Sequence, residues 1–210
     1  MIWVLYGIWL VAVLVALVRA PWRGLLVNRL EPVFAGSLAV LVLIWQLRVG
    51  AGPAQSLHFL GVTAVTLMFG WCLTLVGASI VSIVFLVAGS ESARLLPVTL
   101  FASVLVPATV TFVVDRAVAR WLPRNPFVYI FLCAFLAGVL SALLNIPLKV
   151  ALLSAAGTGL PLDPSTESLA VLPLFAFPEG VLNGMLITVL VVLRPHWLRT
   201  YIDPPVHRSP

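Results

Sequence analysis

The sequence predicts an all-α protein, a polytopic bundle of helices that cross a membrane. Of its 210 residues, 62% are hydrophobic and only 9% are charged, whereas soluble domains carry about one quarter charged residues. The mean hydropathy is +1.16, and long apolar runs alternate with short polar clusters along the chain. This composition excludes a water-soluble globule, a disordered chain, a coiled coil and a disulfide-rich scaffold.

Seven apolar runs are candidate membrane crossings, because a helix needs about 20 apolar residues to span the hydrocarbon core. The predicted crossings cover residues 2–18, 32–47, 57–69, 72–88, 95–118, 126–153 and 169–193. The first run has no basic residue before it and no small-residue cleavage site after it, so we expect a retained helix rather than a signal peptide. Residues 1–210 are interpreted as one transmembrane domain, whose last residues, 194–210, form a basic cytoplasmic tail.

The basic residues predict the orientation, because loops rich in Lys and Arg stay on the cytoplasmic side. Nine of the 12 Lys and Arg residues fall in alternate loops and in the C-terminal tail: Arg19, Arg23, Arg29, Arg116, Arg120, Arg124, Arg194, Arg199 and Arg208. With seven crossings, this places the C-terminus inside and the N-terminus outside. The same flanking positions account for the net charge of +5 without a nucleic-acid partner. We expect an integral protein of a bacterial inner membrane that is surrounded by the lipid bilayer.

The third predicted crossing, residues 57–69, is short. As a helix it rises about 20 Å, against a hydrocarbon core of roughly 30 Å. We expect it to begin below the outer surface, with the loop at residues 50–53, Gly-Ala-Gly-Pro, dipping in to meet it. Irregular backbone at that depth is tolerated only where protein covers it or where it lines a watery cavity. The loop before His58 is therefore a candidate wall of a binding site.

Glu179 is the most informative polar residue of the apolar runs, because an ionisable group inside the membrane marks a functional site by default. It lies near the middle of the seventh run, with no basic residue within one helical turn in sequence. Asn183 follows four residues later and so shares its helix face. Two interpretations stay open: Glu179 is a cation ligand or proton carrier, or it is a hydrogen-bonded carboxyl that ties this helix to a neighbour.

His58 is the only histidine within the apolar body of the chain, because His196 and His207 belong to the tail. Neutral imidazole is a common ligand for nickel, cobalt, copper and zinc. The predicted outer position of His58 suits capture of a metal from outside the cell. The alternative is that His58 is a helix cap or an interfacial residue.

The motifs of common enzymes are absent from the sequence. It contains no H-E-x-x-H, G-x-S-x-G, C-x-x-C or Walker motif, and no paired intramembrane carboxylates. We therefore expect neither an enzyme nor a permanently bound cofactor. If transport by this chain uses ATP, another subunit must hydrolyse it.

Two stretches carry a family resemblance. Residues 57–71, LHFLGVTAVTLMFGW, and residues 178–184, PEGVLNG, followed by Arg194-Pro195, resemble the histidine-led helix and the last helix of one permease family. It comprises the membrane substrate-capture subunits of energy-coupling-factor cobalt and nickel transporters, the cobalamin-biosynthesis-type permeases. Its seven-helix layout, with the N-terminus outside, is also similar.

The resemblance implies a transition-metal cargo and names its ligands. In that family the amino-terminal amine, a histidine at position two and the histidine that His58 resembles surround the metal. This chain begins Met1-Ile2-Trp3, so the second-position imidazole is missing. The predicted metal ligands are therefore His58 and the amine of Met1, in a divergent branch of the family.

The leading hypothesis is a permease that captures a small cation, most simply a cobalt- or nickel-like transition metal. It implies separate energy-coupling transmembrane and ATPase subunits as partners. The alternative hypothesis is a non-transporting accessory or assembly subunit of a membrane complex, with a degenerate metal site. The missing histidine at position two favours the accessory subunit, whereas the intramembrane carboxyl of Glu179 favours transport.

Overall fold

The computed structural model describes residues 2–46, 59–123, 125–155 and 172–201. Within these ranges the chain forms helices and short connections but no strand, which confirms the all-α prediction. Two predicted site residues, His58 and Met1, lie outside the described residues, and so does the loop at residues 50–53.

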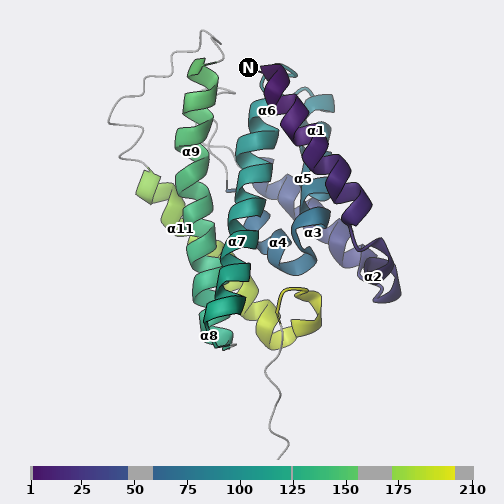
Figure 1. Ribbon diagram of the computed structural model, residues 1–210, viewed down its shortest axis with the longest axis vertical. Helices are drawn as coiled ribbons and strands as arrows, with labels where there is room; N and C mark the ends of the chain where they lie inside the picture. The colour runs from purple at the N-terminus through teal and green to yellow at the C-terminus, as the bar shows by residue number, and fades with distance from the viewer. Residues whose placement is uncertain (1, 47–58, 124, 156–171, 202–210) are drawn as a thin grey trace, which may run out of the picture.

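The α-helices are labelled in chain order in Figure 1. Their bounds are α1 Ile2–Arg19, α2 Trp22–Val27, α3 Glu31–Gln46, α4 Val62–Phe69, α5 Trp71–Val87, α6 Leu96–Thr99, η1 Leu100–Leu105, α7 Val106–Trp121, α8 Pro126–Val128, η2 Tyr129–Leu136, α9 Ala137–Ala155, α11 Leu172–Leu193 and η3 Pro195–Trp197. The α6, η1 and α7 segments form one continuous helix, and so do α8, η2 and α9.

Among the described residues, four helices are long and apolar enough to cross a membrane. They are α1, the continuous helices Leu96–Trp121 and Pro126–Ala155, and α11. The apolar helices α3 and α5, with 16 and 17 residues, are shorter. The polytopic membrane architecture is thus supported by length and composition, while the number of crossings stays a prediction.

Two of the long helices contain π-helical stretches, η1 and η2. A reason for η1 lies in Pro107, two residues after its last residue, Leu105. Proline has no backbone N–H, and its ring collides with the carbonyl oxygen four residues earlier in a regular helix. Widening of the preceding turns relieves that collision, and such stretches often occur near functional sites.

The helices pack into a bundle in which α4 lies at the centre (Figure 1). On one side α1 packs against α5, and on the other α11 packs against α9 and η2, with α7 between α4 and α9. The outer faces of α1, α3 and α11 expose large apolar side chains. Exposed apolar faces of this kind are expected where the surroundings are lipid rather than water.

Helix α4 has only eight residues, and all of them are buried. It rises about 12 Å, so it is shorter than the predicted third crossing. Gly61 and Gly70 bracket it with φ angles of 62° and 83°, a region that residues with a Cβ atom avoid. These two glycines let the chain enter and leave a short helix inside the bundle.

The orientation predicted from the loop charges can be tested by cysteine labelling. A cysteine placed after Arg199 should react with an impermeant reagent only from the cytoplasmic side, and one next to Met1 only from outside. The control is a variant without Cys72 and Cys133, which are the two free cysteines. Labelling of both termini from the same side would contradict the seven-crossing arrangement.

Candidate functional site

The carboxylate of Glu179 lies at the amino-terminal end of α4 and accepts three hydrogen bonds. Its Oε2 accepts from the backbone N–H of Leu60 at 2.8 Å, and its Oε1 accepts from that of Gly61 at 2.9 Å. The side-chain amide of Asn183 donates to Oε1 at 2.7 Å. Glu179 is only 2% exposed. A negative group here also faces the positive end of the α4 dipole, so these contacts tie α11 to α4.

Asn183 extends this contact by one turn of α11. Its Oδ1 accepts from the backbone N–H of Ala64 at 2.9 Å, and its amide also donates to the backbone oxygen of Glu179 at 2.7 Å. Ala64 lies in the first turn of α4, where N–H groups have no partner inside the helix. Such groups are usually capped by a residue just before the helix. Here α11 supplies the caps, from 119 positions further along the chain.

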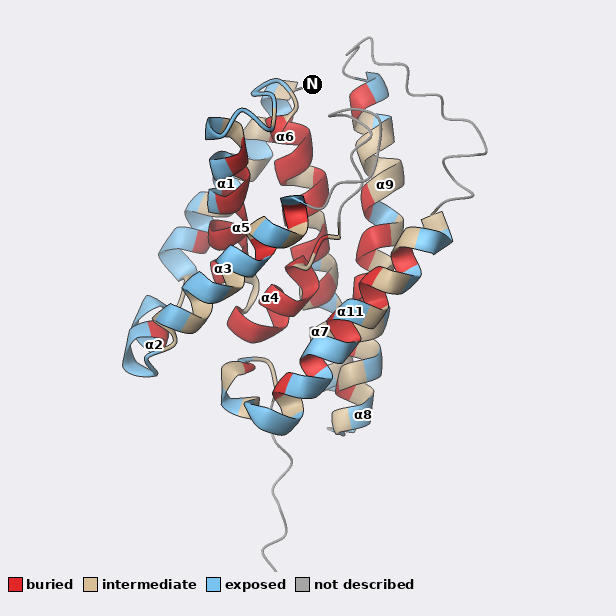
Figure 2. Cartoon of the chain, turned by 180° about the vertical axis from the view of Figure 1, so that it is seen from behind, coloured by how far each residue is buried: buried red, intermediate tan, exposed pale blue. Residues whose placement is uncertain are grey.

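The segment after α11 holds the other end of α4. The backbone N–H groups of Arg199 and Thr200 donate to the carbonyl oxygens of Met68 and Leu67 at 3.0 and 3.3 Å. The guanidinium of Arg199 donates to the carbonyl oxygen of Phe69 at 3.3 Å. These carbonyls belong to the last turn of α4, so α11 and its continuation cap the short helix at both ends (Figure 2). Of the predicted tail, residues 194–201 thus pack on the bundle, and the remainder lies outside the described residues.

Further polar groups lie between the helices around α4. Thr111 donates to Thr63 of α4 at 3.1 Å. The amide of Asn145 on α9 donates to the backbone oxygen of Ala102 in η1 at 2.7 Å. Asn145 was not predicted as a site residue, although an amide inside the predicted crossing 126–153 is a signal of the same kind as Asn183. Ser141, one turn before Asn145, has a buried hydroxyl with no hydrogen-bond partner in the described part of the chain.

Beside α4 lies a cavity of about 830 Å³ between α3 and α11, here called the α3–α11 groove. Glu179 and Asn183 contribute to its lining, together with Gly61 and Ala64 from the start of α4. Most of its other lining residues are apolar. The carboxylate–amide pair therefore lies at the boundary between the buried end of α4 and an apolar groove.

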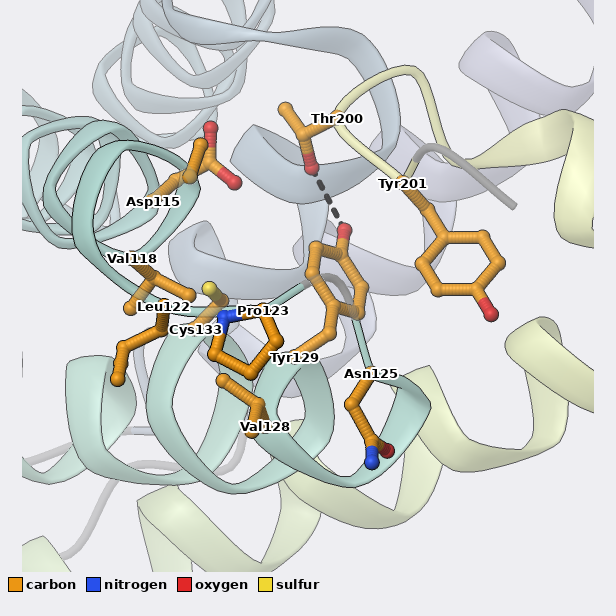
Figure 3. Close-up of a pocket in the computed structure, with 11 residues that line it drawn as sticks. Asp115, Val118, Leu122, Pro123, Asn125, Val128, Tyr129, Cys133, Thr200 and Tyr201 are labelled. Carbon is orange, nitrogen blue, oxygen red and sulfur yellow. Dashed lines mark hydrogen bonds between the residues drawn. The ribbon is translucent and has the colours of Figure 1, made fainter. Parts of the chain in front are cut away.

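A smaller cavity of about 50 Å³ lies between α7, η2 and the segment after η3. Asp115 of α7 and Cys133 of η2 line it, and Tyr129 hydrogen-bonds to Thr200 across it at 2.6 Å (Figure 3). The space suffices for a water molecule. Asp115 was also not predicted as a site residue, although it is an acidic residue within the predicted crossing 95–118. Its carboxylate belongs to this second cavity and does not join Glu179.

The two predicted metal ligands are not among the residues whose positions are described above. In the described ranges, no three His, Cys, Asp or Glu side chains gather closely enough to hold a metal ion. His58 and Met1 are outside these ranges, so their role as ligands stays a prediction. His58 is nevertheless only two residues before Leu60 in the chain, whose N–H is held by Glu179.

The apolar helices pack around the short, buried helix α4, whose ends are capped by α11 and its continuation. This arrangement defines an integral membrane protein of the polytopic, all-helical class. A family model, CbiM, described as the cobalt uptake substrate-specific transmembrane region, matches residues 1–197, and the chain belongs to that family. This confirms the resemblance to the cobalt transporter permeases and makes the chain a membrane component of cobalt uptake. No curated protein matches the sequence.

Proposed function

We propose that this chain captures a transition-metal cation, Co²⁺ in the first place, on the outer side of the membrane and delivers it inward with a separate ATPase module. The family match over residues 1–197 carries this proposal. The absence of any Walker motif from the sequence supports the dependence on another subunit for energy. Uptake of radioactive cobalt by cells that express the chain with and without candidate ATPase subunits tests it; equal uptake in both would contradict it.

In this proposal Glu179 is a positioning residue rather than a metal ligand. Both of its carboxylate oxygens already accept hydrogen bonds from the backbone at the start of α4. The chain segment with His58 leads directly into that backbone. The anchor therefore fixes the backbone that begins two residues after His58, and a fixed backbone next to a ligand is how a protein prepares a metal site before binding.

A second candidate function is an accessory subunit of a membrane complex that has lost metal transport. The observation that favours it is Ile2, which occupies the position where the cobalt and nickel permeases have a histidine. A site with one imidazole is a poor one for nickel or cobalt. Metal binding by the purified chain separates the two candidates, because only the transport component needs it.

Removing the imidazole of His58 should abolish stabilisation of the protein by metal. A metal that binds only the folded state stabilises it by about 2.7 kcal/mol at a concentration 100 times its Kd. His58→Ala should therefore show no shift in thermal unfolding with Co²⁺, Ni²⁺, Cu²⁺ or Zn²⁺, whereas the wild type shifts with at least one of them.

His196→Ala is the matched control for this experiment, because His196 is an exposed histidine in η3. This control should keep the full metal-dependent shift. Equal shifts in the wild type and His58→Ala would remove His58 from the metal site. No shift in the wild type would favour the accessory subunit.

A further inference from the structure

The α3–α11 groove is an apolar channel along the surface of the bundle. Helices α3 and α11 slope in the same direction on either side of α4 (Figure 2), and side chains from all three line the groove. The polar side chains of Ser37, Glu179 and Asn183 in its lining already form hydrogen bonds within the protein. The remaining surface therefore suits a hydrocarbon ligand, and a volume of about 830 Å³ lies in the range of about 300–1,000 Å³ typical of small-ligand sites.

The length of the groove matches one leaflet of a membrane. On α3 its lining extends from Pro32 to Ile44, a rise of about 18 Å along a helix. On α11 it extends from Glu179 to Leu190, a rise of about 17 Å. Half of a hydrocarbon core is about 15 Å thick, so an extended acyl chain would fit along the groove.

One end of the groove is basic. At this end Leu30, Val33 and Trp197 pack against one hydrophobic cluster, and Trp197 also lines the groove. In the chain, Arg29 directly precedes Leu30, and Arg194 is three residues before Trp197. Both arginines are exposed and form no ion pair within the described residues. Among the described residues, Glu31 in the first turn of α3 is an acidic group at this end; Arg199 and the exposed His196 add further basic groups.

We propose that the α3–α11 groove binds an anionic phospholipid, with an acyl chain along α4 and the phosphate between Arg29 and Arg194. The apolar walls and the basic end complement the two parts of such a lipid. Tryptophan at that level is typical of the membrane interface, and basic pockets between transmembrane helices on the cytoplasmic side bind anionic head groups. In the orientation predicted from loop charges, this end faces the cytoplasm.

Filling the groove tests where the acyl chain lies. Gly36 lines the groove, and an added Cβ atom there meets nothing within 4 Å, so Gly36→Phe should fold. Gly7→Phe is the matched control, because Gly7 lies on α1 with the same free space. Native mass spectrometry of the purified chain with phosphatidylglycerol should show at least a tenfold weaker retention of lipid in Gly36→Phe and no change in Gly7→Phe. Gly36→Leu is the second variant if Gly36→Phe does not fold.

Neutralising the basic end tests where the head group lies. The wild type should retain phosphatidylglycerol over phosphatidylcholine, and Arg194→Gln should weaken that preference about fivefold, since one basic residue contributes about 1 kcal/mol near an anionic lipid. Arg120→Gln removes an equal charge from the exposed end of α7 and should have no effect. Equal retention of both lipids by the wild type, or unchanged retention in Gly36→Phe, would overturn the proposal. A wild-type dimer that Gly36→Phe dissociates, or a groove filled by a helix of an energising subunit, would also overturn it.

Discussion

Glu179→Leu is expected to destabilise the protein strongly and to abolish cobalt uptake. The leucine leaves the N–H groups of Leu60 and Gly61 without their acceptor at a buried helix end. Each buried donor that loses its partner costs about 1–3 kcal/mol, so the combined loss is about 2–6 kcal/mol. Thermal unfolding of the purified variant in detergent measures this loss, and uptake in cells measures its consequence. Wild-type stability in Glu179→Leu would contradict the anchoring role.

Glu179→Gln distinguishes anchoring from direct contact with a cation. Glutamine keeps one acceptor oxygen, but its amide nitrogen is a donor and cannot accept from a second N–H. We therefore expect a smaller destabilisation than in Glu179→Leu and a folded protein that keeps its metal-dependent shift. Asn183→Leu, which removes the cap on Ala64, should behave similarly. A stable Glu179→Gln protein without any metal-dependent shift would instead identify Glu179 as a cation ligand.

The apolar runs of the sequence predict most of the helices, because burial in lipid leaves a backbone little choice besides helix. Each of the predicted runs contains helix in the described residues. The run at 57–69 was predicted to be a short helix, and the helix that lies in it, α4, has only eight residues. The π-helical stretches were not predicted from hydropathy, because they depend on backbone hydrogen bonding around residues such as Pro107 rather than on how apolar the segment is.

The site was predictable only in part. The spacing of Glu179 and Asn183 places them on one face, and the direct hydrogen bond between them agrees with it. Their partners, the N–H groups of Leu60, Gly61 and Ala64, are backbone atoms that carry no signal of their own in a sequence. Which helix end meets which carboxylate is set by tertiary packing. A short helix whose N-cap residue is a glycine, Gly61, has no side chain there to cap it, which indicates that its caps must come from elsewhere.

Gly180→Ala is expected to push α11 away from its neighbours and so to disturb the anchor at Glu179. A Cβ atom on Gly180 would come within 2.5 Å of Val139 Cγ2 and 2.9 Å of the backbone oxygen of Phe135, and the backbone cannot yield as a flexible side chain can. Overpacking of this kind costs about 1–3 kcal/mol, and thermal unfolding should show it.

Gly184→Ala is the matched control one turn further along α11. A Cβ atom there meets Phe135 Cβ at 3.4 Å, an ordinary contact, and alanine in a helix is favoured over glycine by about 0.5–1 kcal/mol. Gly184→Ala should therefore be neutral or slightly stabilising, although both variants make the same chemical change in the same helix. If Gly180→Ala is as stable as Gly184→Ala, α11 does not approach η2 as closely as these contacts require. If only Gly180→Ala loses stability together with its metal-dependent shift, the close approach of α11 to η2 is what holds Glu179 against the start of α4.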